Sequence, residues 1–331
     1  MKYAAQFCAL LLALALGGFS GNAASFSSKN VRLSGREYIP LKDWARANQF
    51  AVRWVAFGKT LQISNRTAKV DFSVDPRTDR SKAVFNGVQI SLAFPIYYQN
   101  GTAYISQLDL TQTLSPLLWP PRNSPGIRVK TICIDPGHGG KDPGNQAGPY
   151  NEKKYTLLLA QEVRDQLRAA GFNAVLTRST DYFILPKDRP PLARKAKADL
   201  FVSLHFNDFS GSSGIRGIET YCLTPMGAYS SNSGGEGDTR WVSGNRNNEK
   251  NMLLAYQLHR SMVNALPVED RGVKRARFKV LTDATMPAVL VEGGFMSNST
   301  EMKRIADPAY RRQMARAIVN GILAYRKIIN G

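Results

Sequence analysis

Two of the three histidines in this 331-residue sequence follow short apolar runs that predict buried strands. His138 comes after Val129–Ile134, inside the glycine-rich segment Asp135–Gly140, and His205 comes directly after Leu200–Leu204. Imidazole side chains at the ends of strands can bind a metal ion or transfer a proton. The sequence therefore offers two candidate functional histidines.

Two glutamates complete this pattern. Glu152 lies at the start of a predicted helix, and Glu292 comes directly after the apolar run Val289–Val291. Two imidazoles and one carboxylate around an open fourth position form the ligand set of many catalytic zinc sites. A second carboxylate can then act as the base that activates water at the metal. We therefore predict His138, Glu152 and His205 as metal ligands and Glu292 as the catalytic base.

The two histidines and Glu152 also have simpler explanations. A histidine after a strand is often a turn or surface residue, and Glu152 could serve only the helix dipole. Glu292 has no such explanation, because an idle charge in an apolar run is costly. The third histidine, His259, has helical spacing with Ala255 and Val263, and we interpret it as structural or at the surface.

The elements that must position these residues alternate between strands and helices after residue 127. Strands are predicted at Val129–Ile134, Ala174–Thr177, Leu200–Leu204, Ile218–Leu223, Lys279–Leu281 and Val289–Val291. Helices are predicted at Glu152–Ala170, at Leu253–Leu266 and from Asp307-Pro308 onward. This alternation predicts an α/β fold, with a mainly parallel twisted sheet flanked by helices. Active sites in such sheets lie beyond the carboxyl ends of the strands.

A smaller, β-rich α+β unit is predicted over residues 30–119. Its expected elements are a helix at Leu41–Asn48 and strands at Ala51–Phe57, Thr60–Ile63, Lys69–Phe72, Val88–Leu92 and Ala103–Ile105. Repeated prolines then mark residues 120–127 as a linker, because proline opposes both helix and sheet. The candidate site residues all fall in the second domain, residues 128–331.

The N-terminus has the pattern of a secretory signal peptide. Lys2 precedes the apolar run Cys8–Leu16, and the small and polar stretch Gly17–Ala24 follows. We expect a signal over residues 1–24, cleaved near Ala24, and an exported protein of the periplasm, cell wall or extracellular space. An uncleaved membrane anchor is the alternative, although the apolar run is short for one.

The chain is strongly basic, with 44 Lys+Arg against 25 Asp+Glu and a net charge of +19. Such a charge favours binding to a polyanion. No nucleic-acid-reading motif is present, so an anionic polymer of the cell wall is the preferred partner. Apart from Cys8 in the signal, the cysteines are Cys133 and Cys222, both in apolar runs. We expect two buried free thiols rather than a disulfide.

Four segments, in order along the chain, resemble the catalytic domain of the zinc-dependent amidase_3 family, the N-acetylmuramoyl-L-alanine amidases. They are Ile134–Gly140, Asn151–Lys153, Ser203–Asn207 and Leu290–Asn298, and the resemblance extends from about Arg128 to Arg326. It implies one zinc ion on His138, Glu152 and His205, with Glu292 as the catalytic glutamate. It also implies that the substrate is the amide between N-acetylmuramic acid and L-alanine in peptidoglycan.

Two residues depart from the family pattern. Phe206 replaces the small residue that usually follows the second histidine, and Gly293 replaces a frequent threonine. Neither change removes a ligand, and both are expected to reshape the substrate groove. The polar segment Ser230–Asp238 shows no strong helix signal, so no occluding helix is expected over the site.

The N-terminal unit resembles the copper amine oxidase N-terminal-like domain. Gly35–Leu41 and Gly101–Leu108 echo each other in apolar spacing, and no histidine cluster there indicates a metal. Two other functions stay open for the whole chain: a zinc peptidase that cuts another bond of the wall peptide, and a catalytically silent wall-binding protein. An activator protein is also compatible with this interpretation, but the sequence does not identify one.

Overall fold

The computed structural model describes residues 30–77, 81–209, 214–234 and 237–331. The predicted signal peptide lies outside these ranges. Within them, no helix combines the length and the apolar character that a membrane crossing requires.

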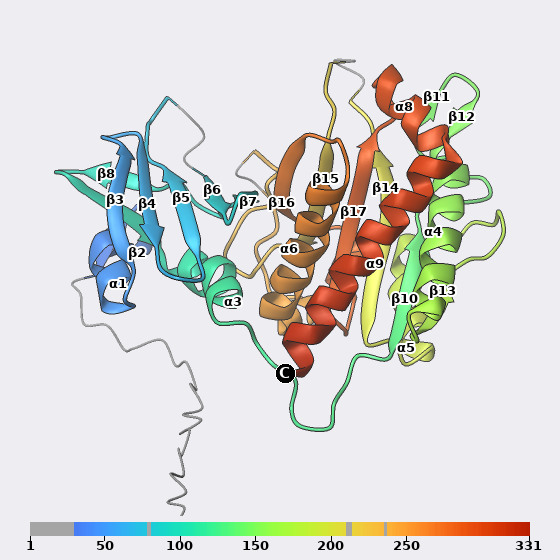
Figure 1. The fold of residues 1–331 in the computed structure, drawn as a ribbon, viewed down its shortest axis with the longest axis horizontal. Coiled ribbons are helices and arrows are strands. Elements are labelled where there is room, and N and C mark those ends of the chain that lie inside the picture. The colour runs from blue at the N-terminus through green and yellow to red at the C-terminus, as the bar shows by residue number, and fades with distance from the viewer. Residues whose placement is uncertain (1–29, 78–80, 210–213, 235–236) are drawn as a thin grey trace, which may run out of the picture.

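The larger unit is built on six neighbouring strands, which Figure 1 shows behind three long helices. Their order is β13 (Asn173–Leu176), β10 (Thr131–Pro136), β14 (Leu200–Asn207), β17 (Ala288–Phe295), β15 (Ile218–Leu223) and β16 (Asp270–Ala276). All neighbouring pairs are parallel except β15 and β17. The predicted α/β fold with a mainly parallel sheet is confirmed.

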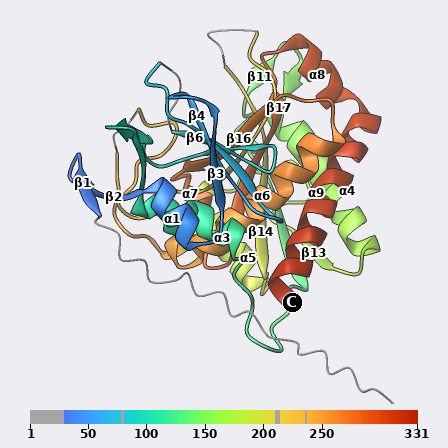
Figure 2. The same cartoon turned by 60° about the vertical axis from the view of Figure 1, so that its left-hand side comes forward.

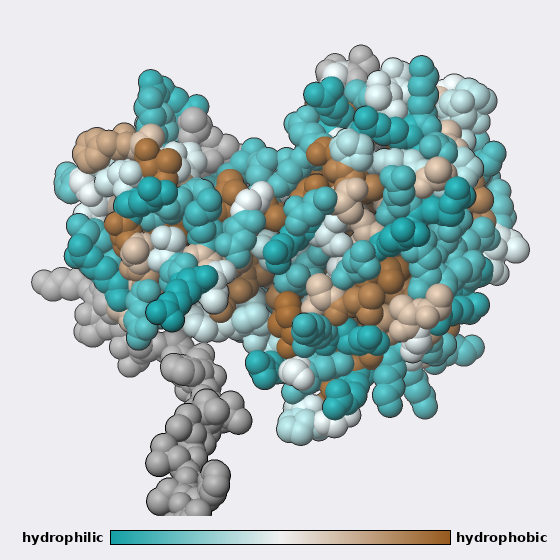
Figure 3. Space-filling model, viewed as in Figure 1, coloured by the Kyte–Doolittle hydropathy of each residue, from teal (hydrophilic) through white to brown (hydrophobic). Residues whose placement is uncertain are grey.

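Helices cover both faces of this sheet, as expected for parallel strands. One face carries α4 (Glu152–Ala169), α6 (Asn248–Ala265) and α9 (Pro308–Asn330), and the other carries the short α5 (Arg189–Lys195) and α7 (Lys279–Thr282). Strand β17 shows the alternation: Val289 and Val291 join the first core, while Ala288 and Leu290 join the second. Hydrophilic side chains dominate the outer side of the long helices in Figure 3.

The helix that carries Glu152 forms for the predicted reason. Tyr155, Leu159, Val163 and Leu167 of α4 are all buried, so its four-residue spacing marks the face against the sheet. Helix α9 also begins where predicted, because the Asp307 side chain accepts a hydrogen bond from the Ala309 N–H.

Several elements of the larger unit differ from the sequence-based expectation. Lys279–Leu281 was expected to be a strand but belongs to helix α7, whose Val280 and Leu281 fill the second core. Short apolar runs do not distinguish strand from helix, which explains this error. Strand β16 and helix α8 (Ser299–Ala306) were not predicted, and the Asn298 side chain caps α8.

The N-terminal unit has two groups of strands. A four-stranded sheet contains β1 (Val31–Leu33), β2 (Arg36–Pro40), β9 (Thr102–Ser106) and β8 (Tyr97–Gln99). The second group is β3 (Ala51–Ala56), β4 (Thr60–Ser64), β5 (Lys69–Ser73), β6 (Lys82–Phe85) and β7 (Val88–Ser91). The helices are α1 (Leu41–Ala47), α2 (Gln107–Asp109), the π-helix η1 (Leu110–Leu114) and α3 (Ser115–Leu118), with α1 and α3 below the strands in Figure 2.

The two units share one sheet. Strand β7 pairs in parallel with β16 through Ile90 and Val273, which gives a continuous sheet of eleven strands. Gln89 strengthens the junction, because its backbone N–H and side-chain amide both donate to Asp270 at 2.9 and 2.6 Å. A single apolar core also runs through both units. The domain boundaries at 119 and 128 stay a prediction, although residues 120–130 contain no helix or strand.

The remaining residues that were expected to be structural are buried. Cys133 and Cys222 are buried and free, as expected. His259 is fully buried, with ring nitrogens 3.0 Å from the Thr220 hydroxyl and 2.9 Å from Asp270. The third histidine therefore supports the junction and lies outside the candidate site.

Candidate active site

Strand pairing aligns three ionisable side chains at one end of the sheet. His205 on β14 is the register partner of Glu292 on β17, and Glu292 is also the partner of Glu219 on β15. Paired residues of adjacent strands point to the same face, so these three side chains face the α5 and α7 side. Two of the four predicted site residues are thus neighbours because of the sheet register alone.

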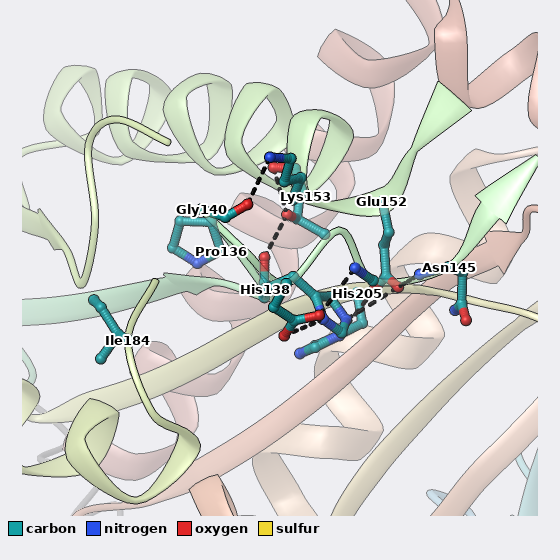
Figure 4. A network of polar contacts seen from close by, with 12 residues as sticks. Pro136, His138, Gly140, Asn145, Glu152, Lys153, Ile184 and His205 are labelled. Atoms are coloured by element: carbon teal, nitrogen blue, oxygen red, sulfur yellow. Dashed lines mark hydrogen bonds and ion pairs between the residues drawn. The ribbon is translucent and has the colours of Figure 1, made fainter. Parts of the chain in front are cut away.

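Glu152 bridges the two predicted histidine ligands. Its Oε2 atom lies 3.0 Å from His138 Nε2, and its Oε1 atom lies 2.9 Å from His205 Nδ1. The candidate ligand atoms of the three residues all lie within 4.8 Å of one another. Figure 4 shows the Glu152 carboxylate reaching both rings. The structure brings together the three residues that the sequence predicted as ligands.

Glu152 is buried and held in its ionised form. Its carboxylate accepts hydrogen bonds from the backbone N–H groups of Asn145 at 2.9 Å and Phe206 at 3.0 Å. Burial opposes ionisation, but the hydrogen bonds and charges of His138 and His205 outweigh it and hold the pKa of Glu152 well below its usual range. An anionic carboxylate between two imidazoles is a donor set suited to a divalent metal.

Two glycines are required by this close packing. A Cβ atom at Gly137 would lie 2.2 Å from the His205 ring, so no other residue fits there. Gly144 has φ +66°, and a Cβ atom there would lie 2.6 Å from His138 Cδ2 and 2.7 Å from Glu152. The glycine-rich segment around His138 therefore lets the backbone approach the ligands.

Asp142 orients His138, and the sequence analysis did not identify this residue. Its Oδ2 atom lies 2.9 Å from His138 Nδ1, which leaves Nε2 facing Glu152. A carboxylate on the far nitrogen of a metal-binding histidine fixes the tautomer and the ring orientation. Burial disfavours a protonated ring, but Glu152 and Asp142 outweigh it and raise the pKa of His138. An acidic residue four positions after the histidine was the available signal.

Two buried arginines hold the backbone that carries His138, and both were also missed. Arg189 donates to the carbonyls of Pro136 at 2.7 Å and His138 at 2.9 Å, and pairs with buried Asp135 at 2.8 Å. Arg178 donates to the carbonyls of Pro136 at 3.1 Å and Gly137 at 2.8 Å. These contacts fix the two peptide groups before His138 and the one after it, and His138 itself has φ 61°. Positive φ is uncommon outside glycine, so the loop needs such support.

Glu292 has the opposite environment to Glu152. Its Oε2 atom is buried and has no hydrogen-bond partner among the residues that the structure describes. Burial, followed by the negative charges of Glu152 and Glu219, raises the pKa of Glu292 well above its ordinary value. A carboxylate in such surroundings has a high affinity for a proton, as a general base requires.

Glu219 forms a charged cluster beside Glu292 that the sequence analysis did not single out. Its Oε1 atom accepts from Lys274 Nζ at 2.6 Å and Arg271 Nε at 2.8 Å, and its Oε2 atom accepts from the Tyr221 hydroxyl at 2.7 Å. Burial opposes ionisation of Glu219, but these cations hold its pKa below the usual value. In this cluster next to the proposed base, two cations therefore pair with the single Glu219 carboxylate.

One cavity of about 330 Å³ contains all four predicted residues. His138, Glu152, His205 and Glu292 line one side, and Phe278, Lys279 and Val280, at and just before α7, line the other. A candidate metal cluster and a proton acceptor thus open into the same space. This arrangement fits water-dependent cleavage of a carbonyl compound.

Comparisons with known proteins agree with this site. Residues 132–324, more than half of the chain, match the Amidase_3 family model, described as N-acetylmuramoyl-L-alanine amidase. The protein YqiI of Bacillus subtilis is 37% identical over 60% of this chain and 86% of its own length. The amidase AmiC of Neisseria meningitidis is 35% identical over 66% of this chain but only 57% of its own length.

A solved structure extends the comparison to the fold. The amidase AmiC2 of Nostoc punctiforme is 32% identical, with a TM-score of 0.50, over 61% of this chain and 99% of that chain. The family match covers the larger unit only, and the resemblance of residues 30–119 to a copper amine oxidase N-terminal-like domain stays a prediction. By its match to the family model and by its fold, the chain belongs to the N-acetylmuramoyl-L-alanine amidase family.

Proposed function

We propose that the protein hydrolyses the amide between N-acetylmuramic acid and L-alanine in peptidoglycan, in a zinc-dependent reaction. The observation that carries this proposal is the shared cavity, which His138, Glu152 and His205 line together with Glu292, whose buried Oε2 atom has no hydrogen-bond partner among the described residues. The relatives named as N-acetylmuramoyl-L-alanine amidases support the substrate.

The residues present fit a zinc ion. Two imidazole nitrogens and one ionised carboxylate converge within 4.8 Å, and Asp142 orients one of the imidazoles. When bound, zinc would polarise the amide carbonyl and make the attacking water more acidic. His138, Glu152 and His205 would hold it.

Glu292 performs the proton transfers in this proposal. Its carboxylate takes a proton from the attacking water as the water oxygen bonds to the carbonyl carbon. The same proton then passes to the alanine nitrogen as the carbon–nitrogen bond breaks, so that the products are the lactyl carboxylate and a free amine. Phe278 and Val280, opposite Glu292, restrict the water that reaches it.

The basic chain and its predicted signal support an exported enzyme that is retained on the wall. The net charge of +19 favours anionic wall polymers as well as peptidoglycan itself. Neither nucleic acid nor, after signal cleavage, a membrane is proposed as a partner.

Digestion of purified peptidoglycan tests the reaction. The protein is incubated with the wall, and the newly freed N-terminus is identified by labelling and mass spectrometry. Free alanine N-termini are expected. Another N-terminal residue would indicate the alternative zinc peptidase, and zinc binding without any release would indicate the wall-binding protein.

A further inference from the structure

Two further cavities continue from the catalytic cavity toward the N-terminal unit. A second cavity of about 490 Å³ shares Phe278 and Lys279 with the catalytic cavity. A third cavity of about 410 Å³ shares Ser230 with the second, and Arg36 and Tyr229 line it from opposite units. The three cavities therefore adjoin one another through shared lining residues, and we refer to them together as the row of cavities.

This row follows the order of the strands in the sheet. The catalytic cavity lies over β14 and β17, the second lies at the end of β16, and the third lies at the end of β7. Because β16 pairs with β7, the last two cavities are held at a fixed separation. The pairing between β7 and β16 therefore places the second and third cavities next to each other.

The second and third cavities have the chemistry of a carbohydrate site. Ser230 and Arg277 offer hydroxyl and guanidinium groups, which suit sugar hydroxyls and acetamido groups. The Arg36 guanidinium lies 4.3 Å from the centre of the Phe94 ring and 6.0 Å from that of Tyr229. An arginine that lies against an aromatic ring is held in place, so its donors are presented without a large entropic cost.

The charges along the row favour a neutral polymer over an anionic one. Lys279 pairs with Asp283 at 2.9 Å, and Arg277 lies 4.0 Å from Asp238. An extended peptide is a poor occupant, because β7 and β16 pair with each other and offer no free edge there. The glycan of peptidoglycan is a neutral polymer and is not an extended peptide, so it meets both conditions. Its muramoyl residue is the part that reaches the catalytic cavity.

We propose that this row of cavities binds the glycan strand next to the muramoyl residue that is cleaved, so that the N-terminal unit forms part of the substrate groove. The proposal rests on the proposed function, since the catalytic cavity defines where the strand begins. Arg36 and Tyr229 contact sugars several units away from the cleaved bond.

Binding of peptide-free glycan strands tests this proposal without requiring turnover. Strands of alternating N-acetylglucosamine and N-acetylmuramic acid, two and eight sugars long and with every lactyl carboxyl capped as a simple amide so that the strands are neutral, are titrated into the full-length protein by calorimetry. We expect the longer strand to bind more tightly in the wild type. Arg36→Ala and Tyr229→Ala should each weaken the eight-sugar strand about tenfold, a factor that corresponds to about 1.4 kcal/mol.

Arg46→Ala is the matched control, because Arg46 is an exposed cation of α1 that lines none of these cavities. It should leave the affinity for both strands unchanged, and thermal unfolding should show all three variants folded. Equal affinity for the two strands in the wild type would overturn the proposal. So would an eight-sugar affinity that survives both Arg36→Ala and Tyr229→Ala. Failure of the proposed reaction would appear separately, as the absence of alanine N-termini from digested wall.

Discussion

Replacing Glu292 by glutamine separates proton transfer from metal binding. Glutamine keeps the size of the side chain but does not accept a proton. We expect turnover to fall by about 10²–10⁴-fold, the usual contribution of a positioned acid–base group. This corresponds to about 2.7–5.4 kcal/mol of activation free energy. Metal content should be unchanged, because Glu292 is not among the three clustered ligands.

The structure also predicts the effect on stability of the metal-free protein. The raised pKa of Glu292 means that the folded state keeps a proton that the unfolded state releases above its ordinary pKa of 4.5. The free energy of unfolding therefore decreases as pH rises from that value to the folded-state pKa, by about 1.4 kcal/mol per pH unit. Glutamine has no such loss, so metal-free Glu292→Gln should unfold at a higher temperature than the wild type at neutral pH.

Three measurements check this prediction: release of soluble wall fragments, bound metal by elemental analysis, and thermal unfolding after chelation at pH 4 and pH 7. The stability gain should be present at pH 7 and small at pH 4. Glu152→Gln is the comparison, because it removes an anionic ligand and should lose metal. If Glu292→Gln loses the metal while Glu152→Gln keeps it and loses only turnover, the two glutamates have exchanged roles. Turnover near the wild-type rate in Glu292→Gln would refute the assignment of the base.

Three further predictions concern the support of the site. Arg189→Lys loses the planar contacts to Asp135 and the loop carbonyls, so metal affinity in a chelator competition should fall by about 10–100-fold. A chain that begins at residue 120 lacks Gln89 and the shared core, and calorimetry should show a lower Tm even where metal is still bound. Gly293→Thr should lower the unfolding temperature, and adding Phe206→Ala should recover part of the loss, because a Cβ at position 293 would lie 3.0 Å from the Phe206 ring.

The candidate ligands, which the structure brings together, could be predicted from the sequence because the signal is local. An apolar strand that ends in a histidine or glutamate places that side chain at the carboxyl edge of the sheet, whatever the rest of the chain does. His205 and Glu292 lie two and three residues before the ends of β14 and β17, so both strands are longer than expected, and the register of these strands makes the two residues neighbours. Glu152 was predictable because an acidic residue at a helix start is both common and easily recognised.

The residues that support the site could not be predicted from local patterns, because each of them contacts a partner that is far away in the sequence. Arg189 reaches the His138 carbonyl across 51 positions of sequence, and Glu219 meets Lys274 across 55. Strand β16 was missed because its charged residues, including Arg271 and Lys274, hide its alternation, yet these are the residues that neutralise Glu219. The charged residues that pair with Glu219 therefore make β16 hard to recognise as a strand from the sequence.

The two departures from the family pattern illustrate how the core and the site are separated by one sheet. Phe206 was expected to reshape the groove, but it is fully buried in the core beneath α4 and α9, on the opposite face from His205. A Cβ atom at Gly293 would lie 2.9 Å from Met314 Sδ and 3.0 Å from the same phenylalanine ring. A large residue at position 206 therefore takes the space that a threonine at 293 would need, and the two changes compensate each other. Phe206 and Gly293 both lie on the face of the sheet that packs against α4 and α9. The core on that face can therefore be repacked while the candidate ligands on the opposite face stay unchanged.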